Sequence, residues 1–202
     1  MRRICVFCGS NFGKNPVYRE VAEELGRRMA RRGVAIVYGG GNVGLMGALA
    51  NAALGAGGEV IGVVPRMLSE REVAHHGVTE LKVVETMHER KALMVELSDA
   101  FLSLPGGIGT MDEFFETLTW AQLDIHRKPC GILNLNGYYD HLVRQLDRFV
   151  EDGFLSPSNR RLIIIREDID QVMYALDHHK PTAGEMFFER DGSRHTVEKR
   201  VS

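Results

Sequence analysis

The stretch LPGGIGTMDEFFE, near the middle of the chain, combines glycines and acids in a way that favours chemistry on a phosphate ester. Its turn 105–110 is typical of a loop that wraps backbone N–H groups around a phosphate, and Thr110 adds a hydroxyl at the start of a helix. Asp112, Glu113 and Glu116 follow at once, although carboxylates repel a phosphate. We therefore expect an anion site whose neighbouring acids serve another purpose.

The acids also have a simpler explanation. Carboxylates in the first turns of a helix stabilise its dipole, which accounts for Asp112 and leaves Glu113 and Glu116 open. These two are three residues apart and share one helix face. The turn lacks the Gly-Lys-Ser/Thr ending of a P-loop, so it does not predict triphosphate hydrolysis. It suits a single phosphate monoester.

A second glycine-rich stretch, VYGGGNVG, has Gly39, Gly41 and Gly44 at G-x-G-x-x-G spacing between an apolar run and a small-residue helix. This fingerprint places a phosphate on a helix N-terminus. A dinucleotide site also needs an acid at the end of the next strand. Glu59 has about the right offset but lies at the start of the run 60–64. The stretch favours a mononucleotide, with a dinucleotide as the alternative.

Arg90 and Lys91 place two cations early in a helix, directly after the run 82–84. The helix dipole prefers acids at this position, so it does not explain them. A ligand anion explains them, and a solvated charged face is the alternative.

Strand-like and helical runs alternate until about residue 180. Most strand-like runs are continuously apolar, which is typical of parallel strands buried on both faces. We expect strands at 3–8, 34–38, 60–64, 82–84, 100–104, 130–133 and 162–165, and helices at 16–32, 44–56, 87–97, 110–124, 138–151 and 169–178. This pattern predicts an α/β class fold: a Rossmann-like, doubly wound, mainly parallel sheet of about seven strands flanked by helices.

The sequence favours one domain at 1–180, followed by a polar tail at 181–202 that is either a flexible end or an arm on a partner subunit. In a doubly wound sheet, ligands bind at the carboxyl ends of the strands. The candidate residues are therefore those just after the strands, at 9–11, 39–42, 65–66 and 105–110.

Composition excludes several classes of protein. A formal net charge of -2 over 202 residues gives no electrostatic footprint for nucleic acid or an anionic membrane. No apolar run approaches the roughly 20 residues that cross a bilayer, and the first ten residues do not resemble a secretory signal. We expect a cytoplasmic protein without nucleic-acid or membrane partners.

Cysteines and histidines do not predict a metal or redox site. Cys5 and Cys8 lie within one apolar run, where residues three apart point to opposite faces, so we expect core cysteines. The eight histidines show no ligand spacing, and the pairs at 75–76 and 178–179 are expected on the surface.

The segment 105–113 is the PGGxGTxxE motif. Together with MHERK at 87–91, TWAQL at 119–123 and NGYY at 136–139, it resembles the LOG (Lonely Guy) family. These are cytokinin riboside 5′-monophosphate phosphoribohydrolases, whose bacterial members are often labelled "possible lysine decarboxylase". The resemblance covers roughly residues 3–180. One local departure is Met111-Asp112, where plant members tend to have Leu-Glu, and this leaves substrate preference open.

The resemblance implies a homodimer that hydrolyses the N-glycosidic bond of AMP or an N6-modified AMP to free base and ribose 5-phosphate, without a cofactor or metal. Arg90 and Glu113 match the catalytic pair. The substrate-binding candidates are Glu72, Lys91, Gly106, Gly107, Gly109, Thr110, Glu116 and Thr119, together with Gly9, Ser10, Gly40, Gly41, Gly44 and Met46 from the first two loops.

Cleavage of this bond passes through a ribose that is positive at C1′ and O4′. Glu113 is expected to stabilise that charge and activate water, while the glycine turn and Thr110 hold the 5′-phosphate. Arg90 acts on either the phosphate or the departing base, and Glu72 on the ribose hydroxyls.

Two other hypotheses compete. A non-catalytic nucleotide or cofactor carrier has the same fold, because fold alone does not specify chemistry. A pyridoxal-dependent lysine decarboxylase needs a Schiff-base lysine, and no segment proposes one.

Overall fold

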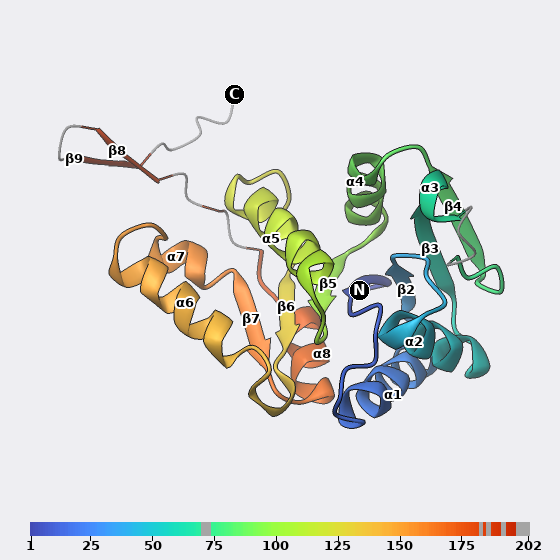
Figure 1. Ribbon diagram of the computed structural model, residues 1–202. Helices are drawn as coiled ribbons and strands as arrows, with labels where there is room; N and C mark the ends of the chain where they lie inside the picture. The colour runs from blue at the N-terminus through green and yellow to red at the C-terminus, as the bar shows by residue number, and fades with distance from the viewer. Residues whose placement is uncertain (70–73, 182–183, 185–186, 191–192, 197–202) are drawn as a thin grey trace.

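The computed structural model describes residues 1–69, 74–181, 184, 187–190 and 193–196. Within these, one parallel sheet has the strand order β4-β3-β2-β1-β5-β6-β7 (Figure 1). Its strands are β1 (Arg3–Phe7), β2 (Ala35–Tyr38), β3 (Val60–Pro65), β4 (Glu80–Val84), β5 (Ala100–Ser103), β6 (Cys130–Leu133) and β7 (Ile163–Arg166). The predicted doubly wound parallel sheet is confirmed.

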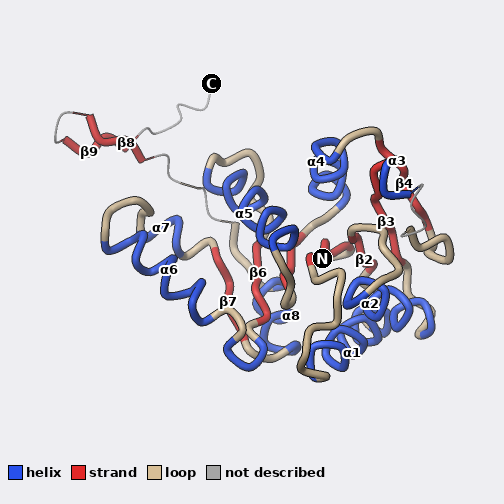
Figure 2. Tube along the Cα trace, in the orientation of Figure 1, coloured by secondary structure: helices blue, strands red, loops and turns tan. Residues whose placement is uncertain are grey.

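Helices cover both faces of the sheet (Figure 2). The larger helices are α1 (Val17–Arg31), α2 (Gly44–Gly55), α4 (Met87–Leu97), α5 (Ile108–Gln122), α6 (Asp140–Glu151) and α8 (Ile169–Asp177). Short turns form α3 (Arg66–Ser69), the 3₁₀ helix η1 (Leu135–Gly137) and α7 (Pro157–Arg160). Helices α1, α2 and α8 pack in one apolar core, and α4, α5 and α6 pack in the core on the opposite face.

Strand β1 shows why the strands are continuously apolar. Ile4 and Val6 pack in the core with α1, α2 and α8, whereas Cys5 and Phe7 pack in the core with α4, α5 and α6. Both faces of the strand are buried, so alternation between polar and apolar residues disappears. Cys8 lies in the core opposite to that of Cys5, and both are free and buried. The prediction of core cysteines is confirmed.

The topological switch point lies between β1 and β5. From β1 the chain proceeds through β2, β3 and β4 to one edge, and from β5 through β6 and β7 to the other. The two strands pair in parallel with Phe7 opposite Ser103, so their carboxyl ends adjoin. Two backbone bonds continue the pairing, from Leu104 N–H to the Phe7 carbonyl and from Gly9 N–H to the Pro105 carbonyl. The loops then diverge and leave a crevice.

Several local expectations need adjustment. Helix α5 begins at Ile108, two residues before the expected start. The expected surface position of His75 is wrong: it is only 6% exposed, because its N–H bonds the Gly40 carbonyl and its ring lies 2.9 Å from Asn51 Oδ1. The polar tail contains an antiparallel hairpin of β8 (Phe187–Arg190) and β9 (Ser193–Thr196). Among the described residues, no helix is long and apolar enough to span a bilayer.

Candidate active site

Arg90 and Glu113, 23 residues apart in sequence, meet as a buried ion pair. Arg90 lies on α4 and Glu113 on α5, with Arg90 Nη1 donating to Glu113 Oε1 at 2.6 Å. Arg90 Nε donates to the Val63 carbonyl of β3 at 3.0 Å. The two side chains are 8% and 12% exposed, so the pair has little contact with solvent. The two predicted catalytic residues are thus held together at the carboxyl edge of the sheet.

Gly39, the residue that follows β2, makes room for this pair. A Cβ atom at Gly39 would overlap the guanidinium of Arg90 and come within 3.2 Å of the Met46 sulfur. Only glycine allows the arginine to lie against the backbone here. The first glycine of the fingerprint therefore has a packing role beside the ion pair.

Burial dominates the electrostatics of Glu113. It raises the pKa of the carboxyl above its ordinary value of 4.5, against the lowering effect of Arg90, and the charge of Asp112 raises it further. A carboxylate with a raised pKa is a stronger base. The site thus favours proton abstraction from a water molecule.

Lys91 forms a second, more exposed group with the other acids of α5. Its Nζ lies 3.2 Å from Asp112 Oδ2 and 3.0 Å from Glu116 Oε2. Burial lowers the pKa of Lys91, but the bonds to Glu116 and Asp112 outweigh it and raise the pKa above its ordinary value. The three acids that follow the glycine turn, Asp112, Glu113 and Glu116, thus pair with the two cations of α4.

The glycine turn before α5 presents its backbone to open space. Gly107 is the N-cap of α5, and a Cβ atom at Gly107 or Gly109 would meet nothing within 4 Å. At Gly106 a Cβ would overlap the hydroxyl of Thr110, which is 4% exposed. The first amides of α5 are therefore accessible to an anion, as such a helix start requires.

A crevice of about 250 Å³ lies at the switch point, between the loops that follow β1 and β5. The predicted residues Gly9 and Ser10 line one side, and Gly106 and Gly107 line the other. The remaining lining residues are Asn11, Phe12, Gly13, Tyr18, Leu45, Pro105 and Tyr138.

The loop between β2 and α2 is largely engaged in packing. The N–H of Leu45, early in α2, donates to the Gly9 carbonyl at 3.0 Å. Gly44 has φ of 55°, and a Cβ there would overlap the Ser10 backbone. Gly40 and Gly41 are buried, and Gly41 forms a β-bridge with Ala74. Contact of this loop with a nucleotide stays a prediction.

Among the described residues, the predicted residue Thr119 makes no hydrogen bond or ion pair with the Arg90–Glu113 pair. Thr119 is exposed on α5, and its hydroxyl donates to the Phe115 carbonyl of its own helix. Glu72 lies outside the described residues. In contrast, Tyr138 donates to the Gly106 carbonyl of the glycine turn and Tyr139 to the carbonyl of Leu104 just before it, although neither tyrosine was a predicted site residue. The sequence feature that could have indicated these contacts is the pair of adjacent tyrosines that follows Asn-Gly, shortly after a strand.

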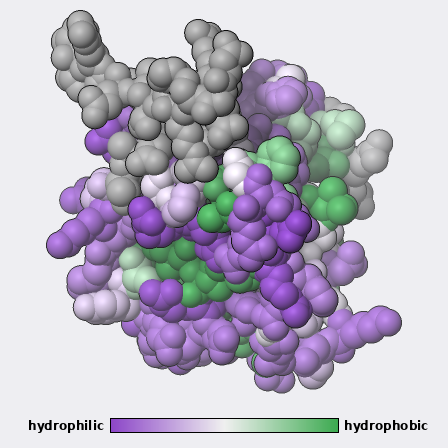
Figure 3. Space-filling model, turned by 90° about the vertical axis from the view of Figure 1, so that its left-hand side faces the viewer, coloured by the Kyte–Doolittle hydropathy of each residue, from purple (hydrophilic) through white to green (hydrophobic). Residues whose placement is uncertain are grey.

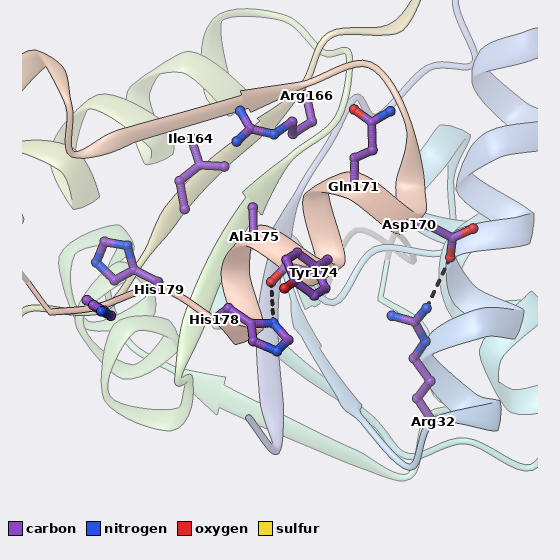
Figure 4. A pocket seen from close by; sticks show the side chains of 10 residues that line it. Arg32, Ile164, Arg166, Asp170, Gln171, Tyr174, Ala175, His178 and His179 are labelled. Carbon is purple, nitrogen blue, oxygen red and sulfur yellow. Dashed lines mark hydrogen bonds and ion pairs between the residues drawn. The ribbon is translucent and has the colours of Figure 1, made fainter.

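A larger hollow of about 800 Å³ lies elsewhere, beside α8 and the edge strand β7 (Figure 4). The face that Figure 3 shows, the left-hand side of Figure 1, is mostly hydrophilic with an apolar area near its centre. The cations of the hollow beside α8 have partners: Arg32 pairs with Asp170 at 3.0 Å, and Arg166 donates to the Ile165 carbonyl. The hollow contains none of the predicted site residues, whereas Gly9, Ser10, Gly106 and Gly107 line the smaller crevice. Arg90 and Glu113 do not line that crevice, so the candidate site consists of the crevice together with the ion pair on α4 and α5.

Fold and site together define a Rossmann-like protein with an open glycine turn at a helix start and a buried Arg–Glu ion pair. Residues 46–176 match the family model described as "Possible lysine decarboxylase". A cytokinin riboside 5′-monophosphate phosphoribohydrolase of Arabidopsis thaliana is 46% identical over 185 residues, which cover 92% of this chain and 85% of the relative. The enzyme of that name from Rhodococcoides fascians is 49% identical over 176 residues, covering 87% and 89%. The chain belongs to this family, the LOG family of the sequence resemblance.

Solved structures share the fold more distantly. The molybdenum cofactor carrier protein of Chlamydomonas reinhardtii superposes with a TM-score of 0.66 at 20% identity, covering 87% of this chain and 96% of that one. A molybdenum cofactor binding protein from Rippkaea orientalis gives 0.66 at 22% identity, covering 87% and 95%. At this identity the likeness establishes the fold alone.

Proposed function

We propose that the chain hydrolyses the N-glycosidic bond of AMP or of N6-modified cytokinin riboside 5′-monophosphates, releasing the base and ribose 5-phosphate. The observation that carries this is the buried Arg90–Glu113 pair, 2.6 Å between Nη1 and Oε1, beside the open glycine turn. The relatives at 46% and 49% identity, named for this activity, support it.

Glu113 acts on the sugar. The transition state carries positive charge at C1′ and O4′, and a carboxylate near that carbon stabilises it. The raised pKa of Glu113 also suits a general base that deprotonates the attacking water. The water oxygen bonds to C1′ as the bond from C1′ to the base nitrogen breaks, and the base leaves with the electron pair. One water proton stays on the new C1′ hydroxyl, and the proton that Glu113 takes from the water balances the one that the base takes up.

The glycine turn acts on the other end of the substrate. The backbone amides of Gly106, Gly107 and Gly109 and the hydroxyl of Thr110 hold the 5′-phosphate at the positive end of the α5 dipole. One ribose separates the phosphate from C1′, so the anion site and Glu113 serve different atoms.

Arg90 holds Glu113 in place. Two of its donors are engaged by Val63 and Glu113, and a guanidinium has five. The others are available to the phosphate or to the departing base. Lys91, Glu116, Thr119 and Glu72 complete the proposed nucleotide contacts, together with Gly9, Ser10, Gly40, Gly41, Gly44 and Met46.

We also propose a homodimer. Ile108, directly after the turn at the start of α5, is 86% exposed, and Met87 at the start of α4 is 39% exposed. Apolar side chains beside a candidate site favour coverage by a second copy. Light scattering after size-exclusion chromatography measures the mass directly. The cytoplasmic compartment stays a prediction of the sequence.

The decisive experiment incubates purified protein with AMP, GMP, CMP and isopentenyl-AMP and measures free base by chromatography. Adenine or prenylated adenine should appear together with ribose 5-phosphate in equal amount. If no nucleotide releases its base while AMP still binds, the enzyme assignment is wrong and the carrier hypothesis takes its place. The ratio of kcat/KM for AMP and isopentenyl-AMP then identifies the preferred base.

A further inference from the structure

Tyr138 and Tyr139 lie at a turn built to aim both side chains at one loop. The turn follows β6, with Asn136 and Gly137 at φ of 51° and 69°, a left-handed pair of the kind that Asn-Gly adopts readily. The buried Asn134 fixes it: its Oδ1 accepts from the Tyr139 N–H at 2.7 Å, and its Nδ2 donates to Asp140 at 2.8 Å.

Both hydroxyls donate hydrogen bonds to backbone carbonyls at the start of the loop that follows β5. Tyr138 donates to the Gly106 carbonyl and Tyr139 to the Leu104 carbonyl, each at 2.6 Å. Between them, the Pro105 carbonyl accepts from Gly9 N–H at 3.1 Å. The carbonyls of Leu104, Pro105 and Gly106 are therefore fixed by three donors from other parts of the chain. The bond to Leu104 orients no amide, because Pro105 has no N–H.

Fixing a carbonyl also fixes the next amide, because C=O and N–H point in opposite directions across a trans peptide plane. The bond to the Pro105 carbonyl orients the N–H of Gly106, and the bond from Tyr138 orients the N–H of Gly107. Neither N–H has an acceptor among the described residues. The turn thus holds two amide donors in a set direction with nothing to receive them.

We propose that Tyr138 is a positioning residue that sets the amide of Gly107 for the substrate phosphate, beside the Gly106 amide that the bond from Gly9 orients. Such preorganised donors bind an anion more tightly than a turn free to rotate, because the ordering cost is met during folding. The inference rests on the proposed function for the identity of the anion, a phosphate monoester.

The test replaces Tyr138 by Phe, which removes one hydroxyl and keeps the ring that packs edge-on against Tyr18 and Tyr139. We expect affinity for AMP and for ribose 5-phosphate, measured by calorimetry, to fall about fivefold, the effect of one lost hydrogen bond. KM for AMP should rise by a similar factor, with kcat within about twofold. The kcat/KM for adenosine, which lacks the phosphate, should not change.

The matched control is Tyr174→Phe, the same chemical change on the exposed side of α8, away from the crevice. It should leave all five quantities at wild-type values: the affinities for AMP and ribose 5-phosphate, KM and kcat for AMP, and kcat/KM for adenosine. Tyr139→Phe is a second control: the hydroxyl that it removes bonds the Leu104 carbonyl, and the next residue, Pro105, has no N–H to orient. Because Tyr139 is only 3% exposed, this variant should lower the melting temperature without a selective loss of affinity for ribose 5-phosphate.

Wild-type affinity for ribose 5-phosphate in Tyr138→Phe overturns the proposal. An equal loss for adenosine and AMP also overturns it, because it indicates a general structural role. If the wild-type protein binds AMP but releases no base, the proposed function fails, whereas the calorimetric comparison still decides the role of Tyr138.

Discussion

Replacing Glu113 by Gln separates binding of the nucleotide from its cleavage. The substitution keeps the shape and an acceptor oxygen for Arg90 Nη1 but removes the negative charge. Only the transition state carries positive charge on the ribose, so affinity for AMP should remain close to that of the wild type. Turnover should fall by about 10²- to 10⁴-fold, the range for loss of a general base.

The structure also sets the cost in stability. Removing one partner of a buried ion pair costs about 3–5 kcal/mol when nothing replaces it. Gln retains a hydrogen bond, and Arg90 keeps its bond to the Val63 carbonyl, so we expect about 1–3 kcal/mol. At about 2–4 °C per kcal/mol, the melting temperature falls by about 2–12 °C. The variant should therefore still be folded at 25 °C.

The control is Asp112→Asn, the same change of charge one residue earlier. Asp112 is 56% exposed and pairs only with Lys91 among the described residues, at 3.2 Å. The free energy of unfolding of the Asp112→Asn variant should differ from that of the wild type by less than about 1 kcal/mol. The assay combines initial rates of adenine release with calorimetric titration of AMP. Wild-type turnover in Glu113→Gln, or equal losses in both variants, would refute the assigned role.

Three further predictions follow from burial and packing. Glu113 must be ionised to act, so kcat/KM should fall as pH drops through its pKa, which burial raises above 4.5. The negative charge of Asp112 also raises this pKa, so Asp112→Asn should move the acid limb of the pH profile to lower pH. Gly39→Ala should displace Arg90, lower the free energy of unfolding by about 1–3 kcal/mol and reduce turnover in parallel. The control is Gly55→Ala in α2: its Cβ meets open space, so a thermal melt should show a neutral or stabilising effect. The three cysteines should react with a thiol reagent only after unfolding, because burial raises their pKa; fast labelling of the native protein contradicts this.

The sequence predicted the sheet well because burial on both faces is a strong local signal. Strand β6 is buried at every position and β1 at every position after Arg3, and their bounds were expected to within one residue. β4 is the informative exception. It begins at Glu80, two residues before the expected start, because its pattern at the sheet edge mixes exposed and half-buried residues.

The candidate site was only partly readable for a different reason. Sequence identified the glycine turn, Glu113 and Arg90, but the pairing of the last two depends on α4 and α5 converging above β3 and β5. The roles of Gly39 and Tyr138 depend on contacts between segments far apart in the chain. Such contacts leave no periodic pattern. His75 was misplaced for the same reason, since the backbone pairing that buries it is not encoded by its neighbours.

The coexistence of acids with an anion-binding turn follows from this pairing. Glu113 is matched by Arg90, and Asp112 and Glu116 are matched by Lys91, so the three acids that follow the glycine turn are compensated by cations of α4. Arg90 is itself fixed by Val63 and by the space at Gly39, and its charge therefore stays in place as the reaction proceeds. In the proposed reaction the substrate meets a nearly neutral pair in the ground state. Once C1′ becomes cationic, the Glu113 carboxylate gains an attraction that the ground state lacks, and this difference is what lowers the barrier.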